Sequence, residues 1–91
     1  MLMLVVTEVA EACEADRKDV YCTLDKSQMN VLMGWVKDED FKRNYQDLVK
    51  GTFEEEMADV IIRILDLCAF KKIDIERHVA AKMRMNSMRE K

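Results

Sequence analysis

The segment from Met57 to Phe70 constrains the fold more than any other part of the sequence. On a helical wheel of about 100° per residue, its charged residues fall within a stripe roughly 60° wide; they are Asp59, Arg63 and Asp66. Apolar residues cover about 220° of the rest, whereas a surface helix usually has an apolar arc of around 100°. In a short chain one neighbouring layer cannot cover such an arc, so the segment predicts association with other copies into a helical bundle. The alternative is a monomer in which this is the central helix.

The composition agrees with an all-α chain. The 91 residues include no proline, eight methionines and two glycines, Gly34 and Gly51. So few turn-forming residues exclude a β-sandwich or a barrel, and the many Glu, Lys, Ala and Leu residues favour helices. The length suits one domain over residues 1–91. We therefore expect a single bundle of about three to four helices, completed by oligomerisation.

The first half of the chain gives one clear helix and a less regular region. Apolar residues recur at helical intervals over about 3–18, and this helix has no capping residue before it. Residues 25–28 are interpreted as a connection, and 31–36 contain a short apolar cluster. Residues 41–49 have the spacing of an amphipathic turn or two, which Gly51 ends.

The second half gives two better defined helices. Thr52 and Glu55 fit a capping box, in which the threonine oxygen accepts an early backbone N–H and the glutamate reaches back. This helix continues to about Phe70. Asp74 is then predicted to cap a last helix, from Ile75 to about Arg89.

Charge and cysteine content exclude several classes of function. Lysine and arginine number 15 against 18 acidic residues, so the net charge is −3 and nonspecific binding to DNA or RNA is not expected. The chain has three cysteines, without Cys-x-x-Cys spacing, and one histidine. These residues do not form a usual zinc-binding set. We expect free, mostly buried thiols in a reducing compartment.

With no signal sequence and no run of about 20 apolar residues, the chain is expected to be soluble and cytoplasmic, without a membrane partner.

Two acidic pairs have the spacing of neighbours on one helix face. They are Glu8 with Glu11, and Glu56 with Asp59. If the two helices cross or run antiparallel, four carboxylates meet and cannot all stay ionised without cations. Oxygen ligands without histidine favour Mg²⁺ or Mn²⁺ over zinc or copper.

Two simpler interpretations of these acids stay open. Such spacings are common on solvated acidic faces, and Asp59 has the spacing to pair with Arg63, and Arg63 with Asp66. A ferritin-like di-iron site is excluded in its usual form because it needs Glu-x-x-His repeats and the chain has only His78.

A basic stripe on the last helix is the candidate substrate contact. Lys82, Asn86 and Arg89 lie at i, i+4 and i+7. Beside a carboxylate-bound cation, a lysine and an asparagine would hold the remaining oxygens of a polyphosphate. The alternative is a solvated basic face near the end of a helix.

Taken together, these residues resemble the MazG-like family of all-α nucleoside triphosphate pyrophosphohydrolases. The family pattern is a Glu-x-x-Glu, a later Glu-x-x-Asp and a downstream Lys-Met-x-x-Asn. The corresponding segments here are Thr7-Glu8-Val9-Ala10-Glu11-Ala12, Glu55-Glu56-Met57-Ala58-Asp59-Val60 and Lys82-Met83-Arg84-Met85-Asn86. The resemblance covers about residues 4–18 and 52–89, including the run Ile73-Asp74-Ile75-Glu76.

The resemblance implies hydrolysis of nucleoside triphosphates, often deoxy or noncanonical, to a monophosphate and pyrophosphate, as pool control or house-cleaning. It implies that Mg²⁺ is held by the four acids Glu8, Glu11, Glu56 and Asp59, one of which also takes a proton from water. Lys82 and Asn86 would contact phosphate or sugar, and the chain would form a dimer or tetramer.

Two departures from the family pattern keep other functions open. Family members commonly carry a helix before the Glu-x-x-Glu helix, whereas seven residues precede Glu8. We therefore expect a domain that lacks this helix. Lys71 and Lys72 also stand where a helix-ending glycine is usual. One alternative is a nucleotide-binding or oligomerisation module without turnover, and another is a purely structural bundle.

Overall fold

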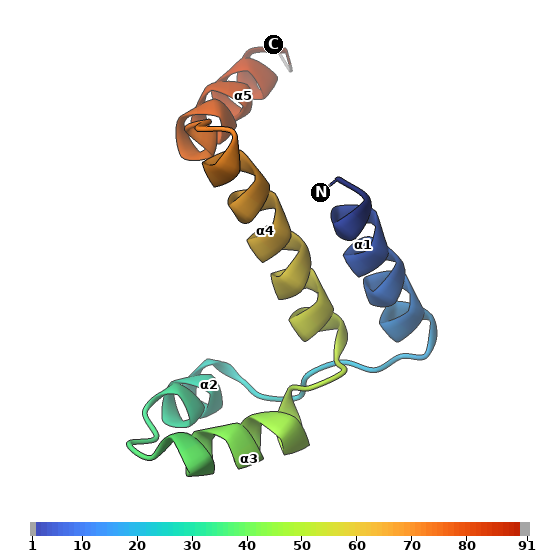
Figure 1. Cartoon of the computed structure of the whole chain (residues 1–91), viewed down its shortest axis with the longest axis vertical. Coiled ribbons are helices and arrows are strands. Elements are labelled where there is room, and N and C mark those ends of the chain that lie inside the picture. The colour runs from blue at the N-terminus through green and yellow to red at the C-terminus, as the bar shows by residue number, and fades with distance from the viewer. Residues whose placement is uncertain (1, 90–91) are drawn as a thin grey trace.

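The computed structural model describes residues 2–89, which fold into helices and contain no strand (Figure 1). This confirms the all-α class, although the described residues hold more helices than the three to four expected. The additional helix lies in the middle region, where the sequence indicated only one short helical element. The five helices are α1 (Leu2–Arg17), α2 (Lys26–Met33), α3 (Asp38–Leu48), α4 (Phe53–Phe70) and α5 (Ile75–Arg89).

The helices pack as two pairs, α1 against α4 and α2 against α3. Figure 1 shows that α1 and α4 run antiparallel, side by side. Small side chains lie where they meet, because Ala12 and Ala15 of α1 are buried, as is Val60 of α4. Leu32 of α2 and Val49 after α3 are buried as well. The core is therefore small and divided between two places.

Two loops join the pairs and cross each other (Figure 1). The backbone N–H of Phe53 donates to the carbonyl of Val20 at 2.8 Å, and the N–H of Cys22 donates to a carboxylate oxygen of Glu54, also at 2.8 Å. These bonds fix the loop after α1 to the first turn of α4. They place the start of α4 beside the end of α1.

Of the two hydrogen bonds of the capping box predicted for α4, the first is confirmed. The Thr52 hydroxyl oxygen accepts from the backbone N–H of Glu55 at 3.2 Å. The Glu55 carboxylate reaches back as expected, but it accepts from the N–H of Gly51 at 2.8 Å instead of that of Thr52. The reason is that the Thr52 N–H already donates to the carbonyl of Val49.

Helix α2 corrects the interpretation of residues 25–28 as a connection. Asp25 caps this helix: its carboxylate accepts from the N–H of Gln28, and the Gln28 amide oxygen accepts from the N–H of Asp25. This is a capping box with aspartate and glutamine in the two roles. The signal was present in the sequence at the same spacing as in Thr52 and Glu55.

The end of α4 has the bonding of a Schellman motif. Ile73 N–H donates to the carbonyl of Cys68 and Lys72 N–H to that of Ala69. Lys72 therefore adopts a φ of 60°, a left-handed conformation that glycine takes more readily. This turn therefore forms with a lysine at the position where a helix-ending glycine is usual. Asp74 then caps α5 as expected, accepting from the N–H of Arg77 at 3.2 Å.

The molecule is extended. Helix α5 leaves the end of α4, and none of the other described helices packs along it (Figure 1). The radius of gyration is 16.5 Å, against about 12 Å for a compact domain of this length. The accessible surface is 7783 Å², against roughly 5,500 Å² for a compact 10.7 kDa monomer. Much of the apolar surface that the sequence predicts to be buried in a bundle is therefore exposed to solvent.

The cysteines are free, as expected, but they are not mostly buried. Cys13 is exposed, and Cys22 and Cys68 are half-buried. Of the helices in residues 2–89, none is long and apolar enough to cross a bilayer.

Candidate metal centre

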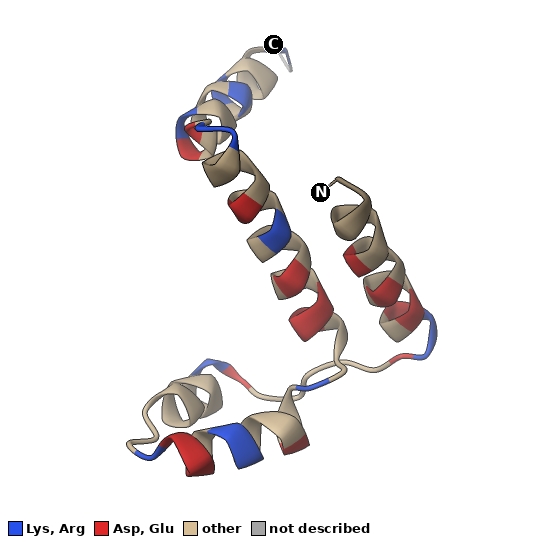
Figure 2. Ribbon diagram, in the orientation of Figure 1, with Lys and Arg blue, Asp and Glu red and all other residues tan. Residues whose placement is uncertain are grey.

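The antiparallel pairing of α1 and α4 brings acidic residues of both helices together. Glu8, Glu11 and Glu56 each place one carboxylate oxygen within 4.8 Å of the others. Figure 2 shows acidic residues along this part of both helices. Glu8 and Glu11 are one turn apart on α1, and Glu56 lies in the first turn of α4. Three of the four predicted carboxylates are thus in one cluster.

Glu56 is the most perturbed of these acids. Burial raises its pKa to about 7, and a hydrogen bond with Glu11 and the charges of Glu11, Asp59 and Glu55 act in the same direction. Its Oε2 atom is buried and has no hydrogen-bond partner within the described chain. A carboxylate in this position gains from a proton or from a cation.

Asp59 is half-buried one turn further along α4, but it is not part of the three-oxygen group. It is near enough for its charge to contribute to the raised pKa of Glu56. The structure therefore places Asp59 at the edge of the cluster.

Arg63 lies at the other edge, and sequence reasoning did not connect it with Glu8. Its Nε atom is 3.5 Å from Oε1 of Glu8, with the Arg63 side chain 46% exposed and that of Glu8 13%. The contact is an ion pair, longer than a good hydrogen bond. Within residues 2–89, Arg63 forms no ion pair with Asp59 or Asp66. Arg63 pairs with Glu8 because of how α1 and α4 are aligned in the antiparallel pair. The sequence of α4 alone does not reveal this alignment.

Lys82 and Asn86 lie on α5, beyond the far end of α4 (Figure 1). The 18 residues of α4 span about 27 Å, and the acidic cluster is at the start of that helix. The chain therefore does not bring this pair to its own cluster. Arg89 donates to the amide oxygen of Asn86 at 3.4 Å, which ties two members of the predicted stripe together.

The donor set of the cluster fits a hard divalent cation. All three donors are carboxylate oxygens, without nitrogen or sulfur. Mg²⁺ and Mn²⁺ take such ligands, and Mg²⁺ usually keeps several waters beside one or two carboxylates. The buried Oε2 atom of Glu56 has no hydrogen-bond partner within the described chain, and a bound cation would give it a partner.

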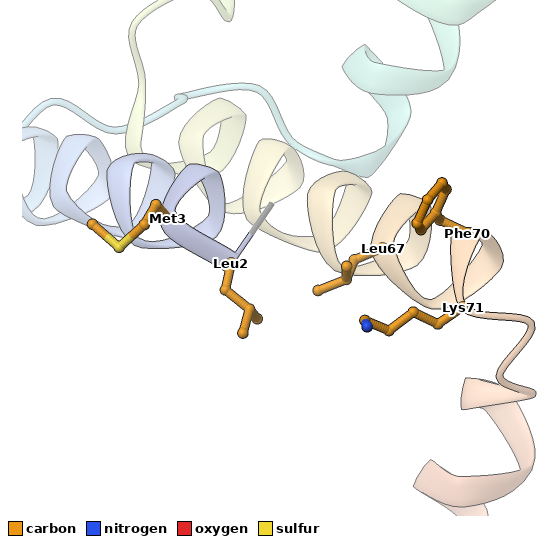
Figure 3. Close-up of a pocket in the computed structure, with 5 residues that line it drawn as sticks. All are labelled: Leu2, Met3, Leu67, Phe70 and Lys71. Atoms are coloured by element: carbon orange, nitrogen blue, oxygen red, sulfur yellow. The ribbon is translucent and has the colours of Figure 1, made fainter.

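An apolar hollow lies at the opposite end of the α1–α4 pair. It has a volume of about 440 Å³ and is lined by Leu2, Met3, Leu67, Phe70 and Lys71. Figure 3 shows these side chains at the beginning of α1 and the end of α4. No carboxylate lines it, so this hollow is separate from the acidic cluster.

Comparison of the chain with protein-family models, with curated proteins and with solved structures finds no match.

Proposed function

We propose that this chain hydrolyses nucleoside triphosphates to a monophosphate and pyrophosphate with Mg²⁺, or Mn²⁺ in its place. The observation that supports the proposal is the convergence of Glu8, Glu11 and Glu56 from two helices that are distant in sequence. These are three of the four acids that the family resemblance implies for cation binding. The proposed substrates include deoxy and noncanonical nucleotides.

The proposed role of each acid follows from its position in the cluster. Glu8, Glu11 and Glu56 would hold the cation, with Asp59 completing the set from the next turn of α4. When bound, the cation would offset the charge of the triphosphate and lower the pKa of a bound water. Arg63 would keep the Glu8 carboxylate oriented through their ion pair. Whichever glutamate is not fully engaged by the cation would accept the proton from water.

Lys82 and Asn86 would bind phosphate or sugar oxygens. Because they lie beyond the far end of α4 in their own chain, this role requires either a rotation of α5 or a second copy of the chain.

The direct test is pyrophosphate release from a broad nucleotide panel with Mg²⁺. Glu56→Gln and Asp59→Asn should abolish release while the helical circular dichroism stays unchanged. Asp66→Asn is the matched control, because Asp66 is exposed on the same helix two turns beyond Asp59. If the unmodified chain releases no more pyrophosphate than Glu56→Gln on any nucleotide, the catalytic proposal is wrong.

Cation binding has a test that does not need turnover. Mg²⁺ should raise the midpoint of thermal unfolding of the unmodified chain by mass action, and Glu11→Gln should remove most of the increase. Sodium chloride at matched ionic strength controls for screening. An equal effect of Mg²⁺ on the chain and on Glu11→Gln would reject the cluster as a cation site.

A second candidate function is a nucleotide-binding or oligomerisation module without turnover. The ion pair of Arg63 with Glu8 favours it, because the guanidinium already offsets part of the acidic charge. Calorimetry that detects Mg²⁺-dependent nucleotide binding, together with no product in the panel, would select this function.

A further inference from the structure

A hollow of about 300 Å³ lies where α2 and α3 meet the first turns of α4. Its apolar lining comes from the loop after α1, from α2, from the end of α3 and from α4, and includes Leu24, Met29, Val49 and Ala58. Sites for small molecules are concave and mostly apolar, with volumes from about 300 Å³ upward. The hollow is therefore at the lower end of this range, with room for one small ring system.

Tyr45 of α3 forms an aromatic wall of the hollow. Burial raises its pKa to about 12, and a hydrogen bond with Glu55 acts in the same direction. Glu55 also accepts from the backbone N–H of Gly51 at 2.8 Å. Its carboxylate is thus engaged within the chain, where it fixes the hydroxyl end of the Tyr45 ring.

Glu54 supplies a second carboxylate, which has an oxygen to spare. Its Oε1 atom accepts from the backbone N–H of Cys22 at 2.8 Å, and both residues line the hollow. Within residues 2–89 the other oxygen of Glu54 accepts no hydrogen bond. The residues that line the hollow include no lysine, arginine or histidine. The hollow therefore suits an uncharged ring that donates a hydrogen bond, and it does not suit a phosphate.

Asp59 lies between this hollow and the acidic cluster. On the helical wheel of α4 it is about 40° from Glu55, at the hollow, and about 60° from Glu56, in the cluster. Beside burial, the charge of Asp59 contributes to the raised pKa of both Tyr45 and Glu56. Residues 54–59 rise only about 8 Å along the helix axis. One ligand can therefore reach the hollow and the cluster together.

We propose that the hollow binds the base of a nucleotide, with its ring against Tyr45 and its exocyclic amino group donating to Glu54. Bases stack on aromatic side chains. A carboxylate accepts from an amino group and repels a carbonyl oxygen, so cytosine and adenine fit and uracil and hypoxanthine do not. The phosphates would then lie at Glu8, Glu11 and Glu56. Only this placement of the phosphates rests on the proposed function.

Titration with nucleosides tests the hollow apart from the cluster, because nucleosides carry no phosphate. With a chelator present, cytidine should shift the NMR signals of Met29 and Leu24 to a saturating value. Uridine, which has a carbonyl in place of the amino group, should bind at least about tenfold more weakly. Adenosine and inosine repeat the comparison for a purine. A preference of this kind in either pair supports the proposal. Binding by neither cytidine nor adenosine, or equal affinity within both pairs, would overturn it.

Ala58→Leu should abolish nucleoside binding, because the larger side chain fills the hollow. Ala58 is exposed, and leucine favours helix nearly as well as alanine, so the helical circular dichroism should stay unchanged. Ala69→Leu is the matched control, at an exposed alanine on about the same side of α4 and three turns further on. Undiminished binding to Ala58→Leu would reject the hollow as the site.

Glu54→Gln tests the hydrogen-bond acceptor. The amide oxygen can still accept from the N–H of Cys22, while the amide nitrogen replaces the second carboxylate oxygen with a donor. The variant should lose the preference for cytidine and bind uridine more tightly than the unmodified chain does. Glu39→Gln, on the exposed surface of α3, should keep the original preference. An unchanged preference in Glu54→Gln would overturn the role proposed for Glu54.

The two proposals fail separately. Nucleoside binding in the hollow, without pyrophosphate release from any nucleotide, keeps this site and rejects the enzymatic function. Pyrophosphate release that is the same for cytosine and uracil nucleotides, and unchanged in Ala58→Leu, rejects the site and keeps the function.

Discussion

Glu56 makes the stability of the cation-free chain depend on pH. Its pKa is raised from 4.5 to about 7 by burial and by Glu11. Below about pH 4.5 the group is protonated whether the chain is folded or unfolded. Between 4.5 and 7 the folded chain binds a proton that the unfolded chain releases, so folding becomes less favourable as the pH rises.

We therefore expect Glu56→Gln to stabilise the chain at pH 8 by about 1 kcal/mol with a chelator present, and to change little at pH 4. The figure is kept below the full cost of the shift because the side chain is partly solvated. Urea unfolding at the two pH values measures the difference, and Glu39→Gln on the exposed side of α3 is the control. Parallel pH profiles for Glu56→Gln and the unmodified chain would contradict the prediction.

Lys72 carries a local strain that a single substitution removes. Its φ of 60° costs a residue with a β-carbon about 1 kcal/mol relative to glycine. Lys72→Gly should raise the midpoint of thermal unfolding by about 5 °C. Lys71→Gly is the control, because Lys71 has an ordinary φ of −86° and should gain nothing. A larger gain from Lys71→Gly than from Lys72→Gly would refute the account of this turn.

At the residue scale, local signals were predictable and contacts between helices were not. The caps at Thr52 and Asp74 follow from spacing within one segment, and both are confirmed. The spacing of Glu56 and Asp59 gives a shared helix face, but not the rotation of that face toward α1. This rotation admits Glu56 to the cluster and leaves Asp59 at its edge. It also turns Arg63 toward Glu8.

The start of α4 depends on one side chain. Thr52 is buried, its hydroxyl donates to the carbonyl of Val49 at 2.7 Å, and the same oxygen caps Glu55. Thr52→Ala should lower the free energy of unfolding by about 1–2 kcal/mol. Chemical denaturation measures the loss, with Thr23→Ala in the exposed loop before α2 as control. Equal losses for Thr52→Ala and the control would show that the cap contributes nothing.

Whole helices were predictable where periodicity and capping agreed, as for α4 and α5, whose bounds match the expected ones. Helix α1, predicted from periodicity alone, matches to within one residue at each end. Helix α2 was missed because its eight residues are too few for a clear apolar period. Its Asp25 and Gln28 capping box was the available signal.

For the molecule as a whole, stability should depend on protein concentration. If the exposed apolar residues of α4, which include Ile61 and Leu65, are covered by a second copy, folding and association are coupled and the unfolding midpoint rises with concentration. Circular dichroism across a wide dilution series should show this for the unmodified chain and a smaller effect for Ile61→Asp. A midpoint that is constant over the series would contradict it.

The overall shape was the least predictable level. The excess apolar arc of α4 indicated that the chain needs a partner, and the exposed Ile61 and Leu65 agree with that need. The direction of α5 was not predictable, because it is set by the turn around Lys72, where the sequence has no glycine. A bundle drawn from periodicity alone folds this helix back, whereas the structure extends it.

The crossing of the two loops has a mechanical consequence. Both connections between the α1–α4 pair and the α2–α3 pair pass through one point, where Val20 is bonded to Phe53 and Cys22 to Glu54. Loosening of the crossing breaks both hydrogen bonds at once, so the amide protons of Cys22 and Phe53 should exchange with solvent together.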